Sequence, residues 1–201
     1  TLNSVPDTLG RQSNCTYKFD FSSPKKIFMP FYDQVIHCAG LAHKVAKSKE
    51  QAKLFFQINF EGTKALLDSL ANKPPKQFML ICTVAVYGLE RGLDINESHA
   101  LAAMDPYGQS KLLAEEYCAK WASEHGVKLL ILRLPLIAGK SPPGNLGKMI
   151  SGIKSGKYLS IAGGRAKRSV VLAEDVAELI ARSFGKSGIF NLTDGYHPSF
   201  R

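Results

Sequence analysis

Three short apolar runs, each of a length suited to one strand, alternate with helical segments along the middle of the chain. The runs are DQVIHCAG (33–40), QFMLICTVAVYG (77–88) and VKLLILRLPLIAG (127–139). The first is apolar on both faces, as expected of a strand inside a parallel sheet. Residues 50–71 have the apolar period of a helix, and residues 106–125 also have a helical pattern. Strands that alternate with helices predict an α/β fold with a doubly wound parallel sheet.

Two further regions extend the pattern toward the ends of the chain. TYKFDF (16–21) alternates like a short strand, and the Pro- and Gly-rich stretch SPPGNLG (141–147) marks a change of organisation. Beyond it we predict a helix near 145–155, a strand in RSVVL, a helix in EDVAELIARSF and a closing segment GIFNLTDG. We therefore expect one domain over 1–140, and over 141–201 part of a small C-terminal lobe with segments that return to the sheet.

The composition fits a globular chain with a sizeable core. Of 201 residues, 45% are hydrophobic, and a chain of this length buries about 70% of the surface that it exposes when unfolded. No apolar stretch reaches the ~18 residues of a membrane span. Residues 1–20 lack the basic start and apolar core of a signal peptide. We expect no membrane attachment.

The four cysteines, Cys15, Cys38, Cys82 and Cys118, show no CxxC spacing. Cys38 and Cys82 lie within apolar strand runs, so we expect both to be packed thiols. Free thiols of this kind favour a reducing compartment, and the predicted location is the cytoplasm. The five histidines share no ligand spacing, and we predict no metal site.

The formal net charge is +9 at pH 7, a balance that suits nucleic acid, acidic lipid or a phosphorylated small molecule. The lysines are scattered, and only KSKEQAK (47–53) and GGRAKR (163–168) are dense. Neither segment has the interleaved aromatic residues of a single-strand-binding surface. The charge therefore argues against nucleic acid, and a diphosphate ligand would account for part of it.

Tyr107 and Lys111 form the pair with the clearest chemistry. They stand four residues apart in PYGQSKLLAEEYC, so both project from one face of the predicted helix 106–125. A nearby ammonium stabilises a phenolate, and we expect Lys111 to lower the pKa of Tyr107 from its usual value of about 10. Such a phenol can move a proton on and off a sugar or alcohol hydroxyl. The spacing alone also fits two unrelated surface residues, so the surrounding segments decide.

Those segments form one ordered series. Around the Tyr–Lys pair stand the small residues that follow DQVIH, the helix INFEGTKALLDSL (58–70), the strand FMLICTVAVYG (78–88) and the strand LLILRLPLIAG (129–139). The series resembles the extended short-chain dehydrogenase/reductase family of nucleotide-sugar epimerases, dehydratases and ketoreductases, from about residue 14 onward. The resemblance implies a Rossmann-type sheet, NAD or NADP as cofactor, a nucleotide-diphosphate sugar, expected to be UDP-linked, as substrate, and a homodimer.

The resemblance assigns three catalytic residues. Tyr107 would exchange the proton of the reacting hydroxyl, Lys111 would also bind the nicotinamide ribose, and Thr83 would hydrogen-bond the reacting oxygen. Many relatives have Ser in place of Thr83, and Thr keeps the hydroxyl, although strand propensity alone also explains a Thr there. A dehydratase of the family needs an acid–base pair directly after this Thr. Val84 and Ala85 follow instead, which argues against dehydration.

The resemblance also assigns residues to the cofactor. Asp20 would accept from the adenine amine, although an Asp at a strand end is also a common turn former. Cys38, Ala39 and Gly40 match a small stretch that lets the cofactor approach the backbone. Close packing of a helix on the sheet would need small residues there as well.

Asn59 matches an Asn that steadies the sheet near the nicotinamide, Pro135 matches a Pro that lines the nicotinamide pocket, and Glu97 matches a Glu common before the catalytic Tyr.

One family element is missing. None of the 17 glycines forms the GxxGxxG or GxGxxG turn that holds the pyrophosphate at a helix N-terminus. We therefore expect the N-terminal βα unit of the fold to be absent from this chain.

The substrate residues are expected beyond residue 140. Asn145 and Leu146 in GNLG resemble a segment that contacts the sugar diphosphate. Arg168 resembles an Arg that clamps a diphosphate with forked, permanently charged donors, although a solvated basic cluster with Lys167 would also explain it. Many relatives have Arg–Asp where this chain has Arg168–Ser169. This variant is more typical of the bacterial branch that makes surface-polysaccharide sugars, including 4-keto-sugar reductases.

Three functions stay open on this reasoning. The first is a nucleotide-sugar 4-epimerase, which reduces and reoxidises NAD within one turnover, and it is the one we predict, in polysaccharide precursor synthesis. The second is a nucleotide-4-keto-sugar reductase that consumes NAD(P)H and uses the same Tyr, Lys and Thr. The third is a non-catalytic nucleotide-binding protein of the same fold. The intact set of three residues argues against it, because a binding protein does not need them.

Overall fold

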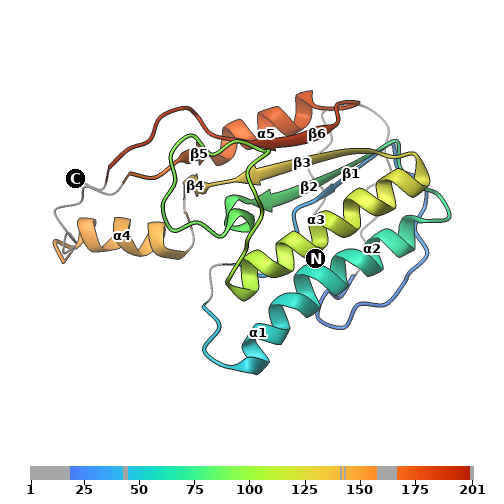
Figure 1. Ribbon diagram of the computed structural model, residues 1–201, viewed down its shortest axis with the longest axis horizontal. Coiled ribbons are helices and arrows are strands. Elements are labelled where there is room, and N and C mark those ends of the chain that lie inside the picture. Colours follow the sequence, from blue (N-terminus) through green and yellow to red (C-terminus); the bar gives the residue numbers. More distant parts are fainter. Residues whose placement is uncertain (1–18, 43–44, 141, 143, 158–166, 200–201) are drawn as a thin grey trace.

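The computed structural model describes residues 19–42, 45–140, 142, 144–157 and 167–199. Four parallel strands form the central sheet, in the order β1–β2–β3–β6 (Figure 1). Their bounds are Gln34–His37 for β1, Gln77–Thr83 for β2, Lys128–Leu134 for β3 and Gly188–Asn191 for β6. A second parallel pair joins β4 (Leu136–Ala138) to β5 (Val170–Leu172). The predicted α/β class with a parallel sheet is confirmed.

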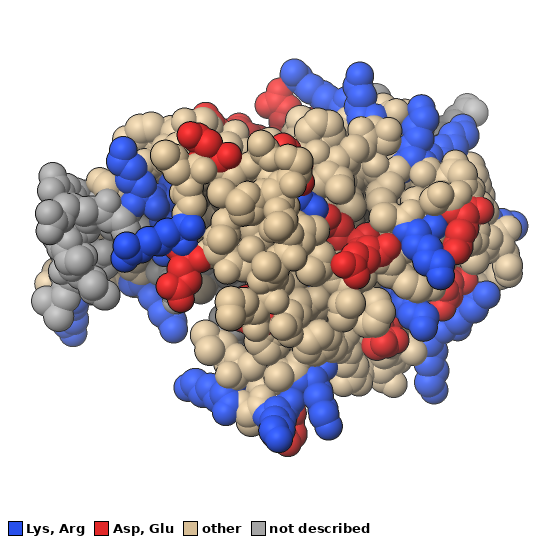
Figure 2. All heavy atoms as spheres, viewed as in Figure 1, with Lys and Arg blue, Asp and Glu red and all other residues tan. Residues whose placement is uncertain are grey.

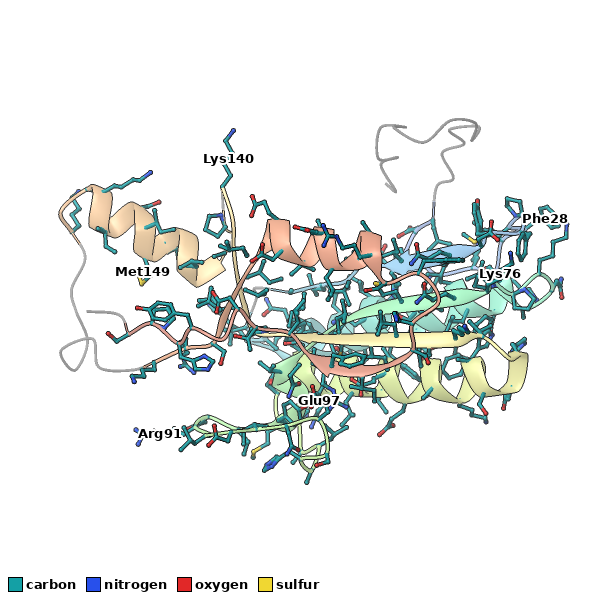
Figure 3. The ribbon with its side chains drawn as sticks, turned by 90° about the horizontal axis from the view of Figure 1, so that it is seen from above. Phe28, Lys76, Arg91, Glu97, Lys140 and Met149 are labelled. Atoms are coloured by element: carbon teal, nitrogen blue, oxygen red, sulfur yellow. The ribbon has the colours of Figure 1, made fainter. Side chains whose placement is uncertain are left out.

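Helices cover both faces of the sheet. On one face lie α1 (Lys49–Phe55), the π-helix η1 (Phe56–Glu61), α2 (Gly62–Leu70) and α3 (Pro106–His125), and α5 (Ala173–Arg182) lies on the other (Figure 3). The 3₁₀ turn η2 (Val84–Tyr87) follows β2 directly. Beyond the carboxyl ends of the strands lies α4 (Gly144–Lys154), next to the β4–β5 pair (Figure 1).

The ends of α3 follow from its sequence. The Asp105 carboxylate accepts from the backbone N–H groups of Tyr107 and Gly108, and Pro106 occupies the first turn, where a missing N–H costs nothing. Gly126 ends the helix in the left-handed conformation at φ 64°. The helix predicted over 106–125 is therefore confirmed, and its start places Tyr107 within the first turn.

An apolar cluster lies on each face of the sheet. On the side of α2 and α3, Phe78, Leu80 and Cys82 of β2 pack with Leu67 and Trp121. On the side of α5, the cluster consists of Met79, Leu130, Leu132, Leu134, Val171 and Val176. Neighbouring residues of β2 therefore enter opposite clusters, as the period of two along a strand requires.

Two predictions about local structure are wrong. Residues 19–21 are not in a strand, and 16–18 lie outside the described residues. The Asp20 carboxylate instead accepts from the N–H and hydroxyl of Ser22, a local turn that competes with strand pairing. Cys38 is exposed, whereas Cys82 and Cys118 are buried, because β1 ends one residue before Cys38. The first cysteine, Cys15, is outside the described part of the chain.

The region after residue 140 contributes to the main sheet, because β6 pairs in parallel with β3. The domain boundary near 140 and the missing N-terminal βα unit stay predictions. None of the described helices is both long and apolar enough to cross a membrane. On the face shown in Figure 2, basic side chains are spread around the rim with acidic ones among them, and they do not merge into one surface.

Candidate functional site

The expected cofactor and catalytic residues from three neighbouring strands meet at one edge of the sheet. In the parallel register, His37 lies opposite Leu80, and Thr83 lies opposite Leu134. Cys38 follows β1, Thr83 ends β2 and Pro135 follows β3. Ligands of parallel α/β sheets bind at this carboxyl edge.

Thr83 and Tyr107 approach each other because α3 packs directly on the turn after β2. A Cβ at Gly108 would lie 2.8 Å from the Ala85 carbonyl oxygen, so only a glycine allows this approach. The Thr83 hydroxyl lies near enough to the Tyr107 phenol to lower the pKa of that phenol. The ring of Phe55 contacts the Tyr107 ring edge-on, at 6.1 Å between centroids. The Tyr107 ring therefore packs on Phe55, and the Thr83 hydroxyl lies near its phenol group.

The pKa of Tyr107 departs from the sequence-based expectation. Burial raises this pKa above its usual value, and the hydrogen bond from Thr83 opposes that rise without cancelling it. Lys111 lies one turn away, but its ammonium donates to the Ile81 carbonyl oxygen at 2.7 Å. The expectation of a lowered Tyr107 pKa is wrong for this structure, in which the phenol is neutral.

Lys111 supplies a buried positive charge below the strand ends. Lys111 is 6% exposed, and within the described ranges it forms no ion pair. This charge acts on a neighbouring thiol, because it opposes the rise in the pKa of Cys82 that burial causes. Burial first, and then this ammonium, lower the pKa of His37 to about 3, so His37 is neutral.

Asn59 ties α3 to the segment after β1. Its side-chain amide donates to the Ser110 hydroxyl at 2.9 Å and to the Leu41 carbonyl at 3.1 Å, and its oxygen accepts from the Leu41 N–H at 2.6 Å. Asn59 lies within the π-helix η1, a form that often marks functional sites. A Cβ at Gly40 would come within 3.1 Å of the Asn59 oxygen. Asn59 therefore joins the segment after β1 to α3, and its place beside the nicotinamide stays a prediction.

His37 and Thr63 extend this set of hydrogen bonds. The Thr63 hydroxyl donates to the Asn59 carbonyl at 2.6 Å, and His37 Nε2 lies 2.8 Å from the same hydroxyl. Because Thr63 has one hydrogen to give, His37 must donate through Nε2, which fixes the imidazole tautomer. Phe21 stacks on the His37 ring at 5.5 Å. Hydrogen bonds through Thr63 thus connect the last residue of β1 to Asn59.

Other expected residues lie apart from this group. Asp20 is exposed, with its carboxylate on Ser22. Leu146 is half-buried in α4, and the side chain of Asn145 lies outside the described atoms. Arg168 is exposed, and its N–H donates to the Pro198 carbonyl at 3.1 Å.

A hollow of about 660 Å³ lies at the start of α4. The residues that line it are Lys140, Pro142, Gly144, Gly147, Lys148, Ile150 and Ser151. Tyr107, Thr83 and Lys111 are not among them, so the hollow is separate from the catalytic candidates. Figure 3 shows Lys140 and Met149 at this end of the molecule. Lys140 and Lys148 give this hollow two cationic groups that the sequence alone did not indicate. Lysines are scattered along the chain, and only the fold shows which of them lie together.

Sequence reasoning also missed the buried ion pair behind the site. Arg133 Nε donates to the Glu115 carboxylate at 3.2 Å, and a second guanidinium nitrogen contacts the other carboxylate oxygen. Glu115 follows Lys111 by four residues, so Tyr107, Lys111 and Glu115 occupy one face of α3. The available signal was an Arg inside the apolar run LLILRLPLIAG, where a charge requires a partner. Within the described residues, no group of three or more His, Cys, Asp or Glu could hold a metal ion.

Comparison with known proteins adds a family. The sequence model of the NAD dependent epimerase/dehydratase family matches residues 10–192. The chain is 34% identical over 134 residues to UDP-glucose 4-epimerase GEPI48 of Cyamopsis tetragonoloba, covering 66% of this chain and 36% of that enzyme. The chain spans about two fifths of the length of the curated relatives that it matches.

Solved structures share the fold. The UDP-glucose 4-epimerase of Thermus thermophilus in complex with NAD superposes with a TM-score of 0.71 and 25% identity, covering 83% of this chain and 58% of that one. RMD from Pseudomonas aeruginosa, complexed with NADPH, superposes with a TM-score of 0.74 and 25% identity. That match covers 92% of this chain and 70% of the Pseudomonas chain.

Proposed function

The chain belongs to the NAD dependent epimerase/dehydratase family, and from that premise we propose that it acts as a nucleotide-sugar 4-epimerase with NAD or NADP. One observation supports this most: Thr83 and the Tyr107 phenol lie near each other at the carboxyl edge of the sheet, with Lys111 one turn further along α3. The relatives named as UDP-glucose 4-epimerases support a UDP-linked sugar as substrate.

The described residues fit the nicotinamide half of such a cofactor. Lys111 offers an ammonium without a carboxylate partner among the described groups, which suits ribose hydroxyls. Cys38, Ala39 and Gly40 leave the backbone accessible after β1, and Pro135 stands at the end of β3. The turn that would hold the pyrophosphate is not in this sequence. When bound, the dinucleotide supplies the hydride chemistry at the sugar carbon.

The side chains of this chain handle the proton. Tyr107 carries its proton on the phenol oxygen, because burial raises its pKa. Thr83 lies beside that oxygen and orients a substrate hydroxyl or ketone between the two groups. Oxidation of a sugar hydroxyl needs Tyr107 as phenolate, so the phenol must first lose its own proton, whereas reduction of the ketone uses the phenol directly. The proton thus passes between Tyr107 and the 4-oxygen of the sugar in both directions.

The neutral phenol also favours a second candidate, a nucleotide-4-keto-sugar reductase. Reduction of a ketone needs a proton donor at the oxygen, and a phenol of raised pKa is in the donor form at neutral pH. The similarity to a Pseudomonas aeruginosa protein complexed with NADPH is consistent with this candidate. A non-catalytic role is less well supported, since Thr83, Tyr107 and Lys111 are all present and grouped.

We also propose a cytoplasmic homodimer. Two buried, free thiols, Cys82 and Cys118, suit a reducing compartment. The dimer is tested by light scattering after size exclusion, where a mass of one chain would overturn it.

The test of function is an assay of the intact protein with UDP-sugars and with a UDP-4-keto-6-deoxy-sugar, following nicotinamide absorbance and analysing products. Interconversion of UDP-sugars without net change of the cofactor supports the epimerase. Stoichiometric loss of NAD(P)H with the keto-sugar assigns the reductase instead. Bound cofactor with neither reaction would contradict both and favour a binding role.

A further inference from the structure

The loop 88–105 joins the turn after Thr83 to the helix that carries Tyr107, and it is fastened at its two ends. At Gly88, with φ 67°, a Cβ would come within 1.8 Å of the Ala102 carbonyl oxygen, so the two ends of the loop cross in contact. The Ala102 N–H donates to the Val86 carbonyl at 3.1 Å. The loop then ends on Asp105, the N-cap of α3. The loop therefore leads directly into the first turn of α3.

The middle of this loop is bonded to the end of β6 through one residue, Asn191. The Asn191 backbone N–H donates to the Glu97 carboxylate at 2.6 Å, and its side-chain amide donates to the Ile95 carbonyl at 3.1 Å. Its side-chain oxygen accepts from the Tyr87 hydroxyl at 2.8 Å. Three groups of one residue thus fasten the loop and the turn η2 to the sheet.

Tyr87 connects this set to the buried ion pair. Its hydroxyl accepts from Arg133 at 2.8 Å while it donates to Asn191, and Arg133 also donates to the Glu97 carbonyl at 3.2 Å. Arg133 is paired with Glu115 of α3. The loop and α3 are consequently held by the same guanidinium, one from each side. Figure 3 shows Glu97 on the side of the sheet covered by α3, opposite α5.

The segment after Asn191 leads to the proposed nucleotide clamp. The Leu192 N–H donates to the Arg133 carbonyl at 3.2 Å, and the Asp194 N–H donates to the Val170 carbonyl at 3.2 Å. Further on, Pro198 accepts from the N–H of Arg168 at 3.1 Å. One continuous segment therefore contacts the loop before Tyr107 at its start and Arg168 near its end.

We propose that Tyr87, Glu97 and Asn191 form a latch that positions the start of α3, and with it Tyr107, relative to the segment that carries Arg168. None of the three is assigned to touch substrate; they are positioning residues. The latch keeps the proton-transfer group and the nucleotide clamp at a fixed separation. The kinetic part of this proposal rests on the proposed function, whereas the structural part does not.

The variant Tyr87→Phe tests the latch, because it removes one hydroxyl and two hydrogen bonds while keeping the ring. In the intact protein, amide hydrogen exchange over 88–111 should accelerate about tenfold or more, because two hydrogen bonds are lost, with the rest of the chain unchanged. With an active substrate, kcat should fall roughly tenfold while KM stays within about twofold, since misplacement affects the reaction more than nucleotide binding.

Two further variants separate positioning from general stability. Glu97→Ala should behave like Tyr87→Phe, whereas Glu97→Gln keeps an oxygen for the Asn191 N–H and should behave like the unchanged protein. The matched control is Tyr117→Phe, which removes the hydroxyl bonded to Asp68 at 3.1 Å, away from the latch.

The outcomes are distinct. Faster exchange confined to 88–111 together with the kcat effect supports the latch. Exchange and kcat equal to those of Tyr117→Phe would overturn it, and so would faster exchange spread over the whole chain with an equal loss in all parameters. If no nucleotide sugar turns over in the unchanged protein, the proposed function fails, and the exchange measurement alone decides the latch.

Discussion

Helix α3, which covers one face of the sheet, and helix α4, which lies beyond the strand ends, are held in different ways. Helix α3 contains eight buried residues and is bonded to η1 at Ser110 and to the sheet at Lys111 and Glu115. In α4, by contrast, none of the described side chains is buried, and the helix lies beyond the strand ends (Figure 1). Proton transfer needs groups fixed within fractions of an ångström. Binding of a nucleotide can order a less embedded helix.

The largest expected effect breaks the chemistry of α3 without changing its packing. Tyr107→Phe removes the phenol oxygen beside Thr83 and should lower turnover by roughly 10²- to 10⁴-fold, the usual contribution of a general acid–base. Binding of the nucleotide sugar, measured by calorimetry, should stay unchanged. Tyr117→Phe on the same helix is the control. Equal turnover in Tyr107→Phe and the unchanged protein would remove the proton-transfer role of Tyr107.

The next effect concerns the anchor of α3. Glu115→Leu leaves the Arg133 guanidinium buried without its carboxylate and should lower the free energy of unfolding by about 3–5 kcal/mol in urea titrations. The double variant Glu115→Leu/Arg133→Met should recover most of that loss, because no charge is left unpaired. A double variant as unstable as the single one would show that the pair contributes more than mutual compensation.

A smaller effect is expected in the region of β5. Arg168→Ala should weaken binding of a nucleotide sugar by about 1.5–3 kcal/mol, as for a lost charged hydrogen bond, and leave stability unchanged because Arg168 is exposed. Arg182→Ala is the matched control, since its guanidinium pairs with Glu178 on the surface of α5. Affinity equal to that of the control would return Arg168 to the solvated surface.

The smallest effect sharpens the contrast between the helices. Ile153 in α4 is 55% exposed, and Ile153→Ala should change the free energy of unfolding by less than about 0.5 kcal/mol. Trp121→Ala in α3, where the side chain is buried, should cost about 3–5 kcal/mol. Both values come from the same urea titrations. A large loss in Ile153→Ala would show that α4 is embedded more deeply than its exposure indicates.

Much of the framework was predictable because it depends on local sequence. The apolar runs gave the first residues of β1, β2 and β3 within one position but extended past their last residues, and Asp105, Pro106 and Gly126 marked both ends of α3. The Tyr–Lys spacing and the position of Thr83 at a strand end placed the catalytic candidates on adjoining elements. Strand order was not available in this way, since β6 adds to β3 across more than fifty residues of chain.

The sequence predicted which residues group at the end of β2 and the start of α3 better than it predicted their pKa values and hydrogen-bond partners. Lys111 was expected to lower the pKa of Tyr107, but the pKa is raised, because burial of the phenol outweighs its hydrogen bond from Thr83. The sequence also did not reveal that one Asp20 carboxylate oxygen accepts from Ser22, and the role of Asp20 at the cofactor stays a prediction. Burial and hydrogen-bond partners depend on packing, and neither can be read from spacing along the chain.

Local sequence is enough to specify which segments become strands and helices, and which side of α3 carries Tyr107, Lys111 and Glu115. These features follow from apolar periodicity, capping residues and the helical repeat, all of which act over a few neighbouring residues. Long-range packing was needed to pair Arg133 with Glu115 and to bring Tyr87 and Asn191 together. Those contacts join residues far apart in the chain, and they form because a buried polar group must find a partner wherever the fold brings one.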